Sequence, residues 1–355
     1  MIKRLTRGLI GTLIAAVLLS VGCSTIYREP RFVITEIKNK EESSGILRSW
    51  LTTEQRVPVP QEPLPLRPIP IRDLHENFQP VLYRLGHSTM LIRLDGDYIL
   101  TDPIFSERAS PVQWIGPKRF HPTPIEIDAL PSIKAVIISH DHYDHLDKAS
   151  IKALADKIEY FLTPLRVGDH LRRWGIEENK IVELDWWQHK QLGSLTLTAT
   201  PAQHFSGRGL LDRDQTLWAS WVIEGQQGKL FFSGDTGYFN GFKEIGERFG
   251  PFDITMIENG AYNAAWADLH MMPEESLQAH LDLQGKAMLP IHNSTFNLAR
   301  HNWFDPLESI DTLAQQHKVQ LITPVFGEAV SITNPGETYA WWREYLPVLA
   351  SVTGG

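Results

Sequence analysis

The chain has 355 residues, of which 42% are hydrophobic and 21% charged, and this composition excludes wholesale disorder. Its formal net charge of −8 argues against a broad basic surface, so we expect no nucleic-acid partner. The single cysteine excludes an intramolecular disulfide, and fourteen histidines are the unusual feature of the composition.

Residues 1–23 have the organisation of a bacterial signal peptide, with a basic start and an uncharged apolar stretch. As a helix, residues 8–22 would span about 22 Å, which is too short for a hydrocarbon core of about 30 Å. Gly22 directly precedes Cys23, and the junction resembles a lipobox, although Ser20 stands where an aliphatic residue is usual. We expect cleavage before Cys23 and its lipidation; an uncleaved anchor helix is the alternative.

Cleavage at this junction would remove three positive charges and take the net charge from −8 to −11. Electrostatic attraction to anionic lipid is therefore not expected, and acyl chains on Cys23 would anchor the protein to the membrane. Ser24 follows the cysteine, and by resemblance to Gram-negative lipoproteins it points to the periplasmic face of the outer membrane. The expected location is thus the bacterial cell envelope.

Residues 24–77 have a weak pattern in which six prolines fall between positions 58 and 70. This spacing favours an extended, polyproline-like strap. The strap could hold the body away from the membrane or wrap along its surface. One folded domain is expected over residues 78–355.

Regular elements follow in chain order within this domain. Helical spacing predicts helices over 149–160 and 273–283, the second starting at a proline that acidic residues follow. Alternating or continuous apolar runs predict strands, over 81–85, 90–94, 98–100, 134–139, 195–200, 219–224, 229–233, 287–292 and 319–324. Clusters of strands separated by helices favour mixed sheets with helices on their outer faces.

A histidine-rich loop follows the predicted strand 134–139 and reads His140-Asp141-His142-Tyr143-Asp144-His145. The pattern His-x-His-x-Asp-His places four potential ligands within six residues, and imidazole and carboxylate groups suit zinc and related divalent metals. A solvated polar loop with chance histidines is the alternative. Three more candidate ligands follow predicted strands, where a common sheet edge could gather them: His204, Asp235 and His292.

The chain resembles the metallo-β-lactamase superfamily, and within it the branch of N-acylphosphatidylethanolamine-hydrolysing phospholipase D. The likeness runs from about residue 85 to about residue 305 and extends well beyond the metal motif, through residues 86–89, 100–105, 116–120, 183–187, 234–238 and 242–253. The resemblance implies a mixed α/β (α+β) fold, a four-layer αββα sandwich, over residues 78–355.

The resemblance also implies two divalent metal ions, expected to be zinc. The first would be held by His140, His142 and His204, the second by Asp144, His145 and His292, and Asp235 would bridge them. Asp102 is expected to orient the histidine loop, with a structural turn before Pro103 as the alternative. The family's ligand pattern has no place for His87, so we expect His87 to pack near the site or support a ligand.

Asp144, Asp235 and His270 are the residues that we expect to act in catalysis. His270 would contact the substrate or its leaving group; a structural role at the start of the helix 273–283 is the alternative. Expected substrate contacts are Tyr143, Leu210 and Leu211.

The implied reaction cuts the phosphodiester of N-acylphosphatidylethanolamine or a similar glycerophospholipid, releasing N-acylethanolamine and leaving phosphatidic acid. Metal-bound hydroxide would attack phosphorus. One alternative is the same fold acting on another bond, such as a lactone. The alternative from another class is a non-catalytic, lipid-binding envelope lipoprotein. The sequence does not determine the oligomeric state.

Overall fold

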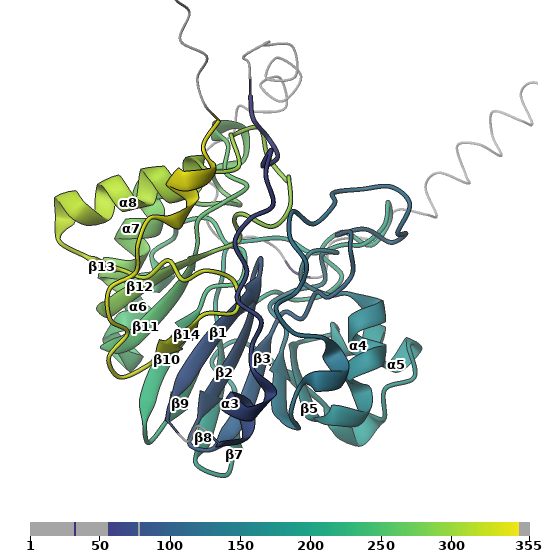
Figure 1. The fold of residues 1–355 in the computed structure, drawn as a ribbon. Coiled ribbons are helices and arrows are strands. Elements are labelled where there is room, and N and C mark those ends of the chain that lie inside the picture. The colour runs from purple at the N-terminus through teal and green to yellow at the C-terminus, as the bar shows by residue number, and fades with distance from the viewer. Residues whose placement is uncertain (1–31, 33–55, 77–78, 348–355) are drawn as a thin grey trace, which may run out of the picture.

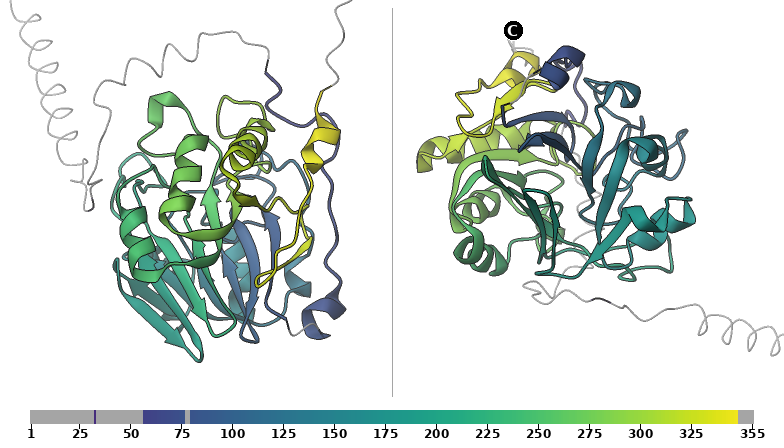
Figure 2. Two further views of the ribbon diagram at one scale, coloured as in Figure 1. Left: turned by 90° about the vertical axis from the view of Figure 1, so that its left-hand side faces the viewer. Right: turned by 90° about the horizontal axis from the view of Figure 1, so that it is seen from below.

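The computed structural model describes Phe32, residues 56–76 and residues 79–347. Within these residues, two seven-stranded sheets stack face to face, and helices cover both outer faces (Figures 1 and 2). The layers are therefore helix, sheet, sheet and helix. This arrangement confirms the αββα sandwich that the family resemblance implies.

The first sheet contains β1 (Val81–Gly86), β2 (Thr89–Leu94), β3 (Asp97–Thr101), β4 (Ile133–Ile137), β5 (Ile158–Pro164), β6 (Ile181–Leu184) and β14 (Ala329–Ser331). Their spatial order is β14-β1-β2-β3-β4-β5-β6. The pairs from β14 to β3 are antiparallel, and the pairs from β3 to β6 are parallel.

The second sheet contains β7 (His189–Leu192), β8 (Leu195–Thr200), β9 (Ser220–Gly225), β10 (Gly228–Phe232), β11 (Phe252–Glu258), β12 (Gly285–Ile291) and β13 (Gln320–Leu321). Their order is β13-β12-β11-β10-β9-β8-β7. The strands β10 to β13 run parallel, so their carboxyl ends meet at one edge, where ligand sites of such sheets usually form.

The main core lies between the two sheets. Alternate residues of β2, Met90 and Ile92, belong to it together with Leu195 and Leu197 of β8. Leu91, whose side chain leaves the opposite face of β2, packs in the outer core beneath the helices. Both faces of the sheet are buried, which explains why strands in this region read as nearly continuous apolar runs.

Helices α3 (Ile71–Glu76), α4 (Lys148–Leu154) and α5 (Gly168–Arg173) contribute to the outer core of the first sheet. The second sheet is covered by α6 (Gly241–Phe249), α7 (Pro273–Asp282) and α8 (Asp305–His317). Short 3₁₀ helices are η1 (Ile127–Ala129), η2 (Ala155–Lys157), η3 (Glu178–Lys180), η4 (Ala264–Trp266) and η5 (Trp341–Tyr345).

Most of the predicted strands recur with ends shifted by a few residues, and β8 has the predicted bounds. The helix predicted over 149–160 is wrong at its end, because α4 stops at Leu154 and β5 begins at Ile158. Buried Ile158 pairs with Ile133 of β4 and Tyr160 pairs with Ala135, and this pairing outweighs helical spacing at the end of the predicted helix. The strand predicted over 319–324 shortens to β13.

The strap over residues 56–76 lies along the body. Leu66 forms a parallel bridge with Phe326, and the backbone N–H of Ile69 donates to the carbonyl oxygen of Pro124 at 3.1 Å. Leu64 is buried in a cluster with Trp341. Of the two expected behaviours, wrapping describes this part of the strap.

The predicted signal peptide, Cys23 and the boundary at residues 77–78 lie outside the described residues. Among those the structure describes, no helix is both long enough and apolar enough to cross a bilayer.

Candidate metal centre

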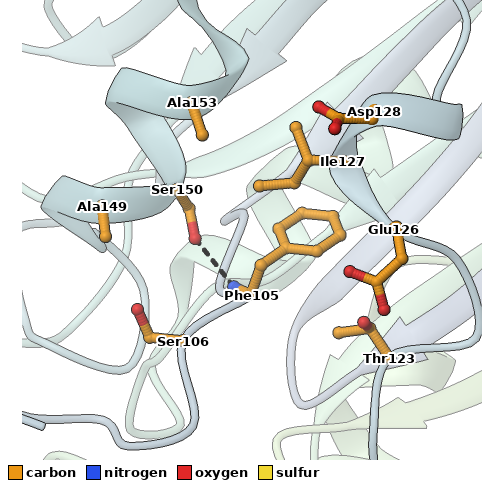
Figure 3. Close-up of a pocket in the computed structure, with 9 residues that line it drawn as sticks. All are labelled: Phe105, Ser106, Thr123, Glu126, Ile127, Asp128, Ala149, Ser150 and Ala153. Atoms are coloured by element: carbon orange, nitrogen blue, oxygen red, sulfur yellow. Dashed lines mark hydrogen bonds between the residues drawn. The ribbon is translucent and has the colours of Figure 1, made fainter.

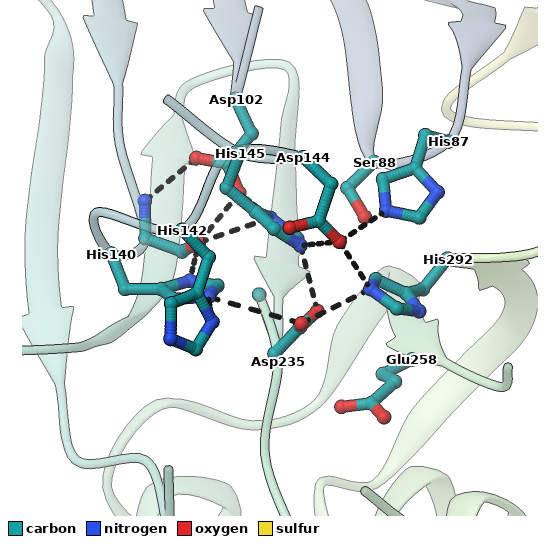
Figure 4. Close-up of polar contacts among 12 residues, drawn as sticks. His87, Ser88, Asp102, His140, His142, Asp144, His145, Asp235, Glu258 and His292 are labelled. Carbon is teal, nitrogen blue, oxygen red and sulfur yellow. Dashed lines mark hydrogen bonds and ion pairs between the residues drawn. The ribbon is translucent and has the colours of Figure 1, made fainter. Parts of the chain in front are cut away.

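The predicted ligands come from loops that follow strands. The histidine-rich loop follows β4, and His204, Asp235 and His292 follow β8, β10 and β12. Figure 4 shows side chains from the loops after β4, β10 and β12 turned toward one another. Gly234 allows the close approach, since its φ is +57° and a Cβ at this position would collide with Ser139.

The first group of potential ligands consists of His140, His142, His204 and Asp235, with one ligand atom of each lying within 4.8 Å of the others. His140 Nε2 lies 2.9 Å from His142 Nδ1, and His204 Nε2 lies 3.3 Å from the same nitrogen. The three histidines that the resemblance assigns to one ion are thus together, with Asp235 beside them.

The second group consists of His87, Asp144, His145 and His292, with ligand atoms within the same limit of 4.8 Å. His145 Nε2 and His292 Nε2 lie 3.5 and 3.3 Å from Asp144 Oδ2. The structure therefore gathers the three residues that the resemblance assigns to the other ion, and adds His87 to them.

Asp235 lies between the two groups. Its Oδ1 is 3.0 Å from His145 Nε2, and its Oδ2 is 3.0 Å from His292 Nε2 and 3.8 Å from His140 Nε2. Asp235 Oδ1 and His145 Nε2 are buried, yet neither makes a hydrogen bond within the described residues. Buried, unsatisfied carboxylate and imidazole atoms that face one another are the donor set a divalent metal requires, so these residues fit the implied metals.

The electrostatics of the centre suit a metal. Burial lowers the pKa of His140 and His204 well below 6.5, so both rings stay neutral at pH 7 and keep a lone pair. Burial opposes ionisation of Asp144 and Asp235, but the neighbouring charge of His145 outweighs it and holds the pKa of both carboxyls well below 3.8. The centre therefore presents anionic carboxylates and, at His140 and His204, neutral imidazoles. Burial opposes protonation of His145 and His292, but the charge of Asp235 outweighs it and raises the pKa of His145 well above 6.5 and that of His292 to about 10, so a metal ion would displace a proton from these two rings.

Asp102 lies behind the histidine loop and is fully buried. Its Oδ1 accepts the backbone N–H of Ser139 at 2.7 Å, while Oδ2 lies 2.7 Å from His145 Nδ1. These contacts fix the ring of His145 with Nε2 directed at Asp235, which is how a carboxylate orients a metal-binding histidine. His87, Asp102 and His292 all have positive φ values, from +31° to +63°, so strained backbone gathers at this centre.

His87 lies closer to the centre than the family pattern indicates. Its side chain is 1% exposed, and Nε2 lies 3.1 Å from Asp144 Oδ2. Its backbone carbonyl accepts the N–H of His292 at 3.2 Å. Burial lowers the pKa of His87 to about 3, so the ring is neutral and able to donate to Asp144. The sequence expectation of a residue that supports a ligand is compatible with these contacts.

His270 and Glu258 form a pair beside Asp235. His270 Nδ1 lies 2.5 Å from Glu258 Oε1, and the backbone N–H of Thr236 donates to Glu258 Oε2 at 2.5 Å. Burial raises the pKa of Glu258 well above 4.5 and lowers that of His270 to about 4. Both shifts favour a neutral pair in which Glu258 donates to Nδ1 and the proton of His270 lies on Nε2. One nitrogen of His270 lies within 4.8 Å of ligand atoms of Asp235 and His292.

Sequence reasoning did not identify Glu258, because β11 was not among the predicted strands. The signal was present, since Phe252, Ile254 and Met256 alternate with polar residues in a strand pattern that ends at Glu258. A carboxylate at the end of a buried strand is the same pattern that identified Asp235.

The expected substrate contacts lie outside the two ligand groups. The hydroxyl of Tyr143 donates to the carbonyl oxygen of Arg208 at 2.9 Å, and the Arg208 guanidinium stacks 3.9 Å from the centre of the Tyr143 ring. Both residues line a cleft of about 680 Å³. Leu210 and Leu211 are exposed at the tip of the loop that follows His204. Their expected contact with the substrate stays a prediction.

The chain belongs to the metallo-β-lactamase superfamily of metal-dependent hydrolases, since the family described as "Beta-lactamase superfamily domain" matches residues 97–293. An uncharacterised protein of Mycobacterium tuberculosis is 49% identical over 262 residues, which cover 73% of this chain and 70% of the relative. N-acyl-phosphatidylethanolamine-hydrolyzing phospholipase D 1 of Caenorhabditis elegans is 34% identical over 65% of this chain and 68% of its own length.

Two further likenesses are partial. A Klebsiella pneumoniae protein named outer membrane protein RomA is 52% identical over 98 residues, or 28% of this chain and 74% of that protein. The crystal structure of an isothiocyanate hydrolase from Delia radicum gut bacteria has a TM-score of 0.57 and 21% sequence identity to this chain. The likeness covers 70% of this chain and 98% of that one. At this identity the likeness concerns the fold alone.

Proposed function

We propose that the protein is a binuclear phosphodiesterase that hydrolyses N-acylphosphatidylethanolamine or a similar glycerophospholipid to N-acylethanolamine and phosphatidic acid. The observation that carries the proposal is a ligand centre with a shared carboxylate in a chain 34% identical to a named N-acylphosphatidylethanolamine phospholipase D. The imidazole-rich ligand set suits zinc.

Two divalent ions would supply a water of lowered pKa and would offset the charge that develops on the phosphoryl oxygens. The chain's own residues determine where this chemistry takes place. Asp144 and Asp235 remain anionic because of their histidine neighbours, and Asp102 holds His145 in one orientation. The loops after β4, β8, β10 and β12 carry the residues that would hold both ions.

His270 donates a proton to the leaving group. The alkoxide of an N-acylethanolamine is a poor leaving group and needs a proton as the P–O bond breaks. Glu258 donates to Nδ1 of His270 at 2.5 Å. As Nε2 gives its proton to the leaving oxygen, the proton of Glu258 passes to Nδ1, so the ring stays neutral and Glu258 becomes the carboxylate. The side chain of His270 is 15% exposed, so this proton can be replaced from solvent after each turnover.

The same proposal includes the cell envelope as location, with acyl chains on Cys23 as the anchor. It is supported by the basic start, short apolar stretch and Gly22-Cys23 junction of the sequence, and by the relative named outer membrane protein RomA. A membrane-bound enzyme would meet its phospholipid substrate without extracting it into water.

The test is a product analysis of the purified, metal-loaded protein against a panel of phospholipids and lactones. We expect N-acylethanolamine and phosphatidic acid from N-acylphosphatidylethanolamine, detected by mass spectrometry, and no product from Asp235→Asn. Lactone opening without phospholipid cleavage would replace the proposed substrate with the alternative one. Failure on every substrate by a protein that binds metal would favour the non-catalytic alternative.

A further inference from the structure

Exposed apolar side chains gather in two loops near the metal centre. Of eight large hydrophobic residues exposed in the described part of the chain, four lie in residues 110–116 and 207–212. Trp114 is 78% exposed and Leu210 is fully exposed, at 100%. Both loops border the cleft of about 680 Å³ that Tyr143 also lines. Clustered apolar side chains that face water indicate an interaction site.

Cations line the same cleft, with Lys148 and Lys152 on α4 and Arg173 on α5. Both lysines are exposed, and neither forms an ion pair within the described residues. The two acidic residues of the lining are engaged by backbone donors: Asp147 accepts the N–H of Ala149, and Asp212 accepts that of Gly209. The cleft is therefore locally positive in a chain whose net charge is −8.

The positive character does not extend to the neighbouring cavity. An adjacent cavity of about 320 Å³, between α4 and η1, is lined by Glu126 and Asp128 and by no lysine or arginine (Figure 3). Phosphate groups would be repelled there and attracted to the neighbouring cleft. The cations and the exposed apolar loops thus share one location.

The amino-terminal segment reaches the same location. The backbone N–H of Phe32 donates to the carbonyl oxygen of Asp214 at 3.0 Å, two residues after the apolar loop 207–212. Cys23 precedes Phe32 by nine residues, and an extended chain of that length spans at most about 30 Å. A lipid on Cys23 would therefore keep this face close to the bilayer that holds the anchor.

We propose that the surface formed by loops 110–116 and 207–212 docks on an anionic glycerophospholipid bilayer. Trp114, Leu210 and Leu211 enter the boundary between headgroups and acyl chains, and the lysines of α4 contact lipid phosphates. Because salt screens charges beyond about 8 Å, this local cluster outweighs the negative net charge that argues against such attraction. The surface is a second membrane contact besides Cys23, and it does not depend on which bond the enzyme cuts.

The test uses the full-length chain reconstituted in vesicles of phosphatidylcholine, with or without phosphatidylglycerol, and amide hydrogen exchange read by mass spectrometry. We expect vesicles with phosphatidylglycerol to slow exchange in both loops by about an order of magnitude. Substitutions are made in one loop, and amide exchange is measured in the other. Leu210→Asp with Leu211→Asp should restore fast exchange in 110–116, and Trp114→Ala should restore fast exchange in 207–212. Lys148→Glu with Lys152→Glu should abolish the effect of phosphatidylglycerol.

Matched controls carry the same changes elsewhere. Ile71→Asp alters an exposed apolar residue of α3, at the other end of the molecule in Figure 1, and Lys243→Glu reverses an exposed charge on α6; neither should affect the loops. Exchange that vesicles do not slow, or that slows equally without phosphatidylglycerol, would overturn the proposal. Slowing that depends on protein concentration and not on lipid would assign the surface to a second copy of the chain instead.

Discussion

Asp235 lies between the two ligand groups and contacts histidines of both. Its two oxygens face different histidines, at 3.0 Å from His145 and 3.0 Å from His292. A carboxylate can bridge two divalent ions about 3.5–4 Å apart, whereas an amide offers only one oxygen and no charge. The side chain at this position therefore decides whether the centre can hold two ions or one.

Asp235→Asn should reduce the metal content from two equivalents per chain to one or fewer. The loss of activity should exceed the roughly 10–100-fold typical of residues that only orient ligands. Elemental analysis after dialysis, together with turnover of the phospholipid substrate, measures both effects. Glu244→Gln, on the exposed face of α6, is the control and should change neither. One metal per chain in fully active wild-type protein would contradict the binuclear centre.

His270→Ala should keep both metals and lower turnover by about 10²-fold, which is the usual contribution of one general acid. Glu258→Gln should lower turnover to a similar extent, because the amide still reaches Nδ1 of His270 but cannot pass a proton to it. A phosphodiester with a better leaving group, such as a nitrophenolate, should lose much less activity in both variants. Equal losses for good and poor leaving groups would show that His270 positions the substrate, and loss of metal would make it structural.

Three parallel strands each deliver one residue to the centre from their carboxyl ends. Asp235 follows β10, Glu258 ends β11 and His292 follows β12. The helix α7 completes the arrangement, because the Ser276 hydroxyl donates to the carbonyl oxygen of Glu258 at 2.7 Å and His270 lies just before the start of α7. The position of His270 therefore depends on how α7 packs against β11.

His280 couples this packing to pH, since its Nδ1 lies 2.7 Å from Thr255 Oγ1 across the α7–β11 contact. Burial lowers its pKa to about 4, below the value near 6.5 of an unfolded chain. The stabilisation is therefore complete above pH 6.5 and is lost as pH falls toward 4, at up to about 1.4 kcal/mol per pH unit.

His280→Gln should make this slope shallower by the share of one histidine, as measured by urea unfolding of metal-free protein at several pH values. His140, His204 and His270, whose pKa values burial also lowers, contribute to the slope that remains. His317→Gln, at an exposed site on α8, should leave the slope unchanged. A slope that is equal in wild type and His280→Gln would show that His280 does not carry the acid sensitivity.

The candidate metal centre lies at one side of the sandwich, and the expected anchor lies near the same side. The histidine loop follows β4 in the first sheet, and the other ligands follow strands of the second. Residues 207–212, which follow His204, link this centre to the proposed docking surface, and Phe32 bonds to Asp214 nearby. Two membrane contacts on one face hold a protein more firmly than either alone, because the second binding event is intramolecular.

Cys23→Ser should release the mature chain from the membrane fraction or leave it with an uncleaved signal peptide. Acyl chains supply the stable part of the anchor, and contact through the docking surface alone should be removed by high salt. Fractionation with and without a salt wash, and the mass of the mature chain, measure the two effects. Unchanged processing and unchanged membrane attachment in Cys23→Ser would exclude lipidation at this position.

The sequence by itself determined the superfamily, the layered fold, most strands and the candidate ligands, since these depend on local spacing and on short motifs such as His140 to His145. Tertiary structure alone decided the features that need long-range pairing. Residues 158–160 belong to the predicted helix 149–160 but begin β5, because Ile158 and Tyr160 pair with β4. Glu258 reaches His270, and the loops 110–116 and 207–212 share one cleft, across chain separations that no local pattern encodes. Side-chain burial and pairing depend on neighbours that only the folded chain supplies.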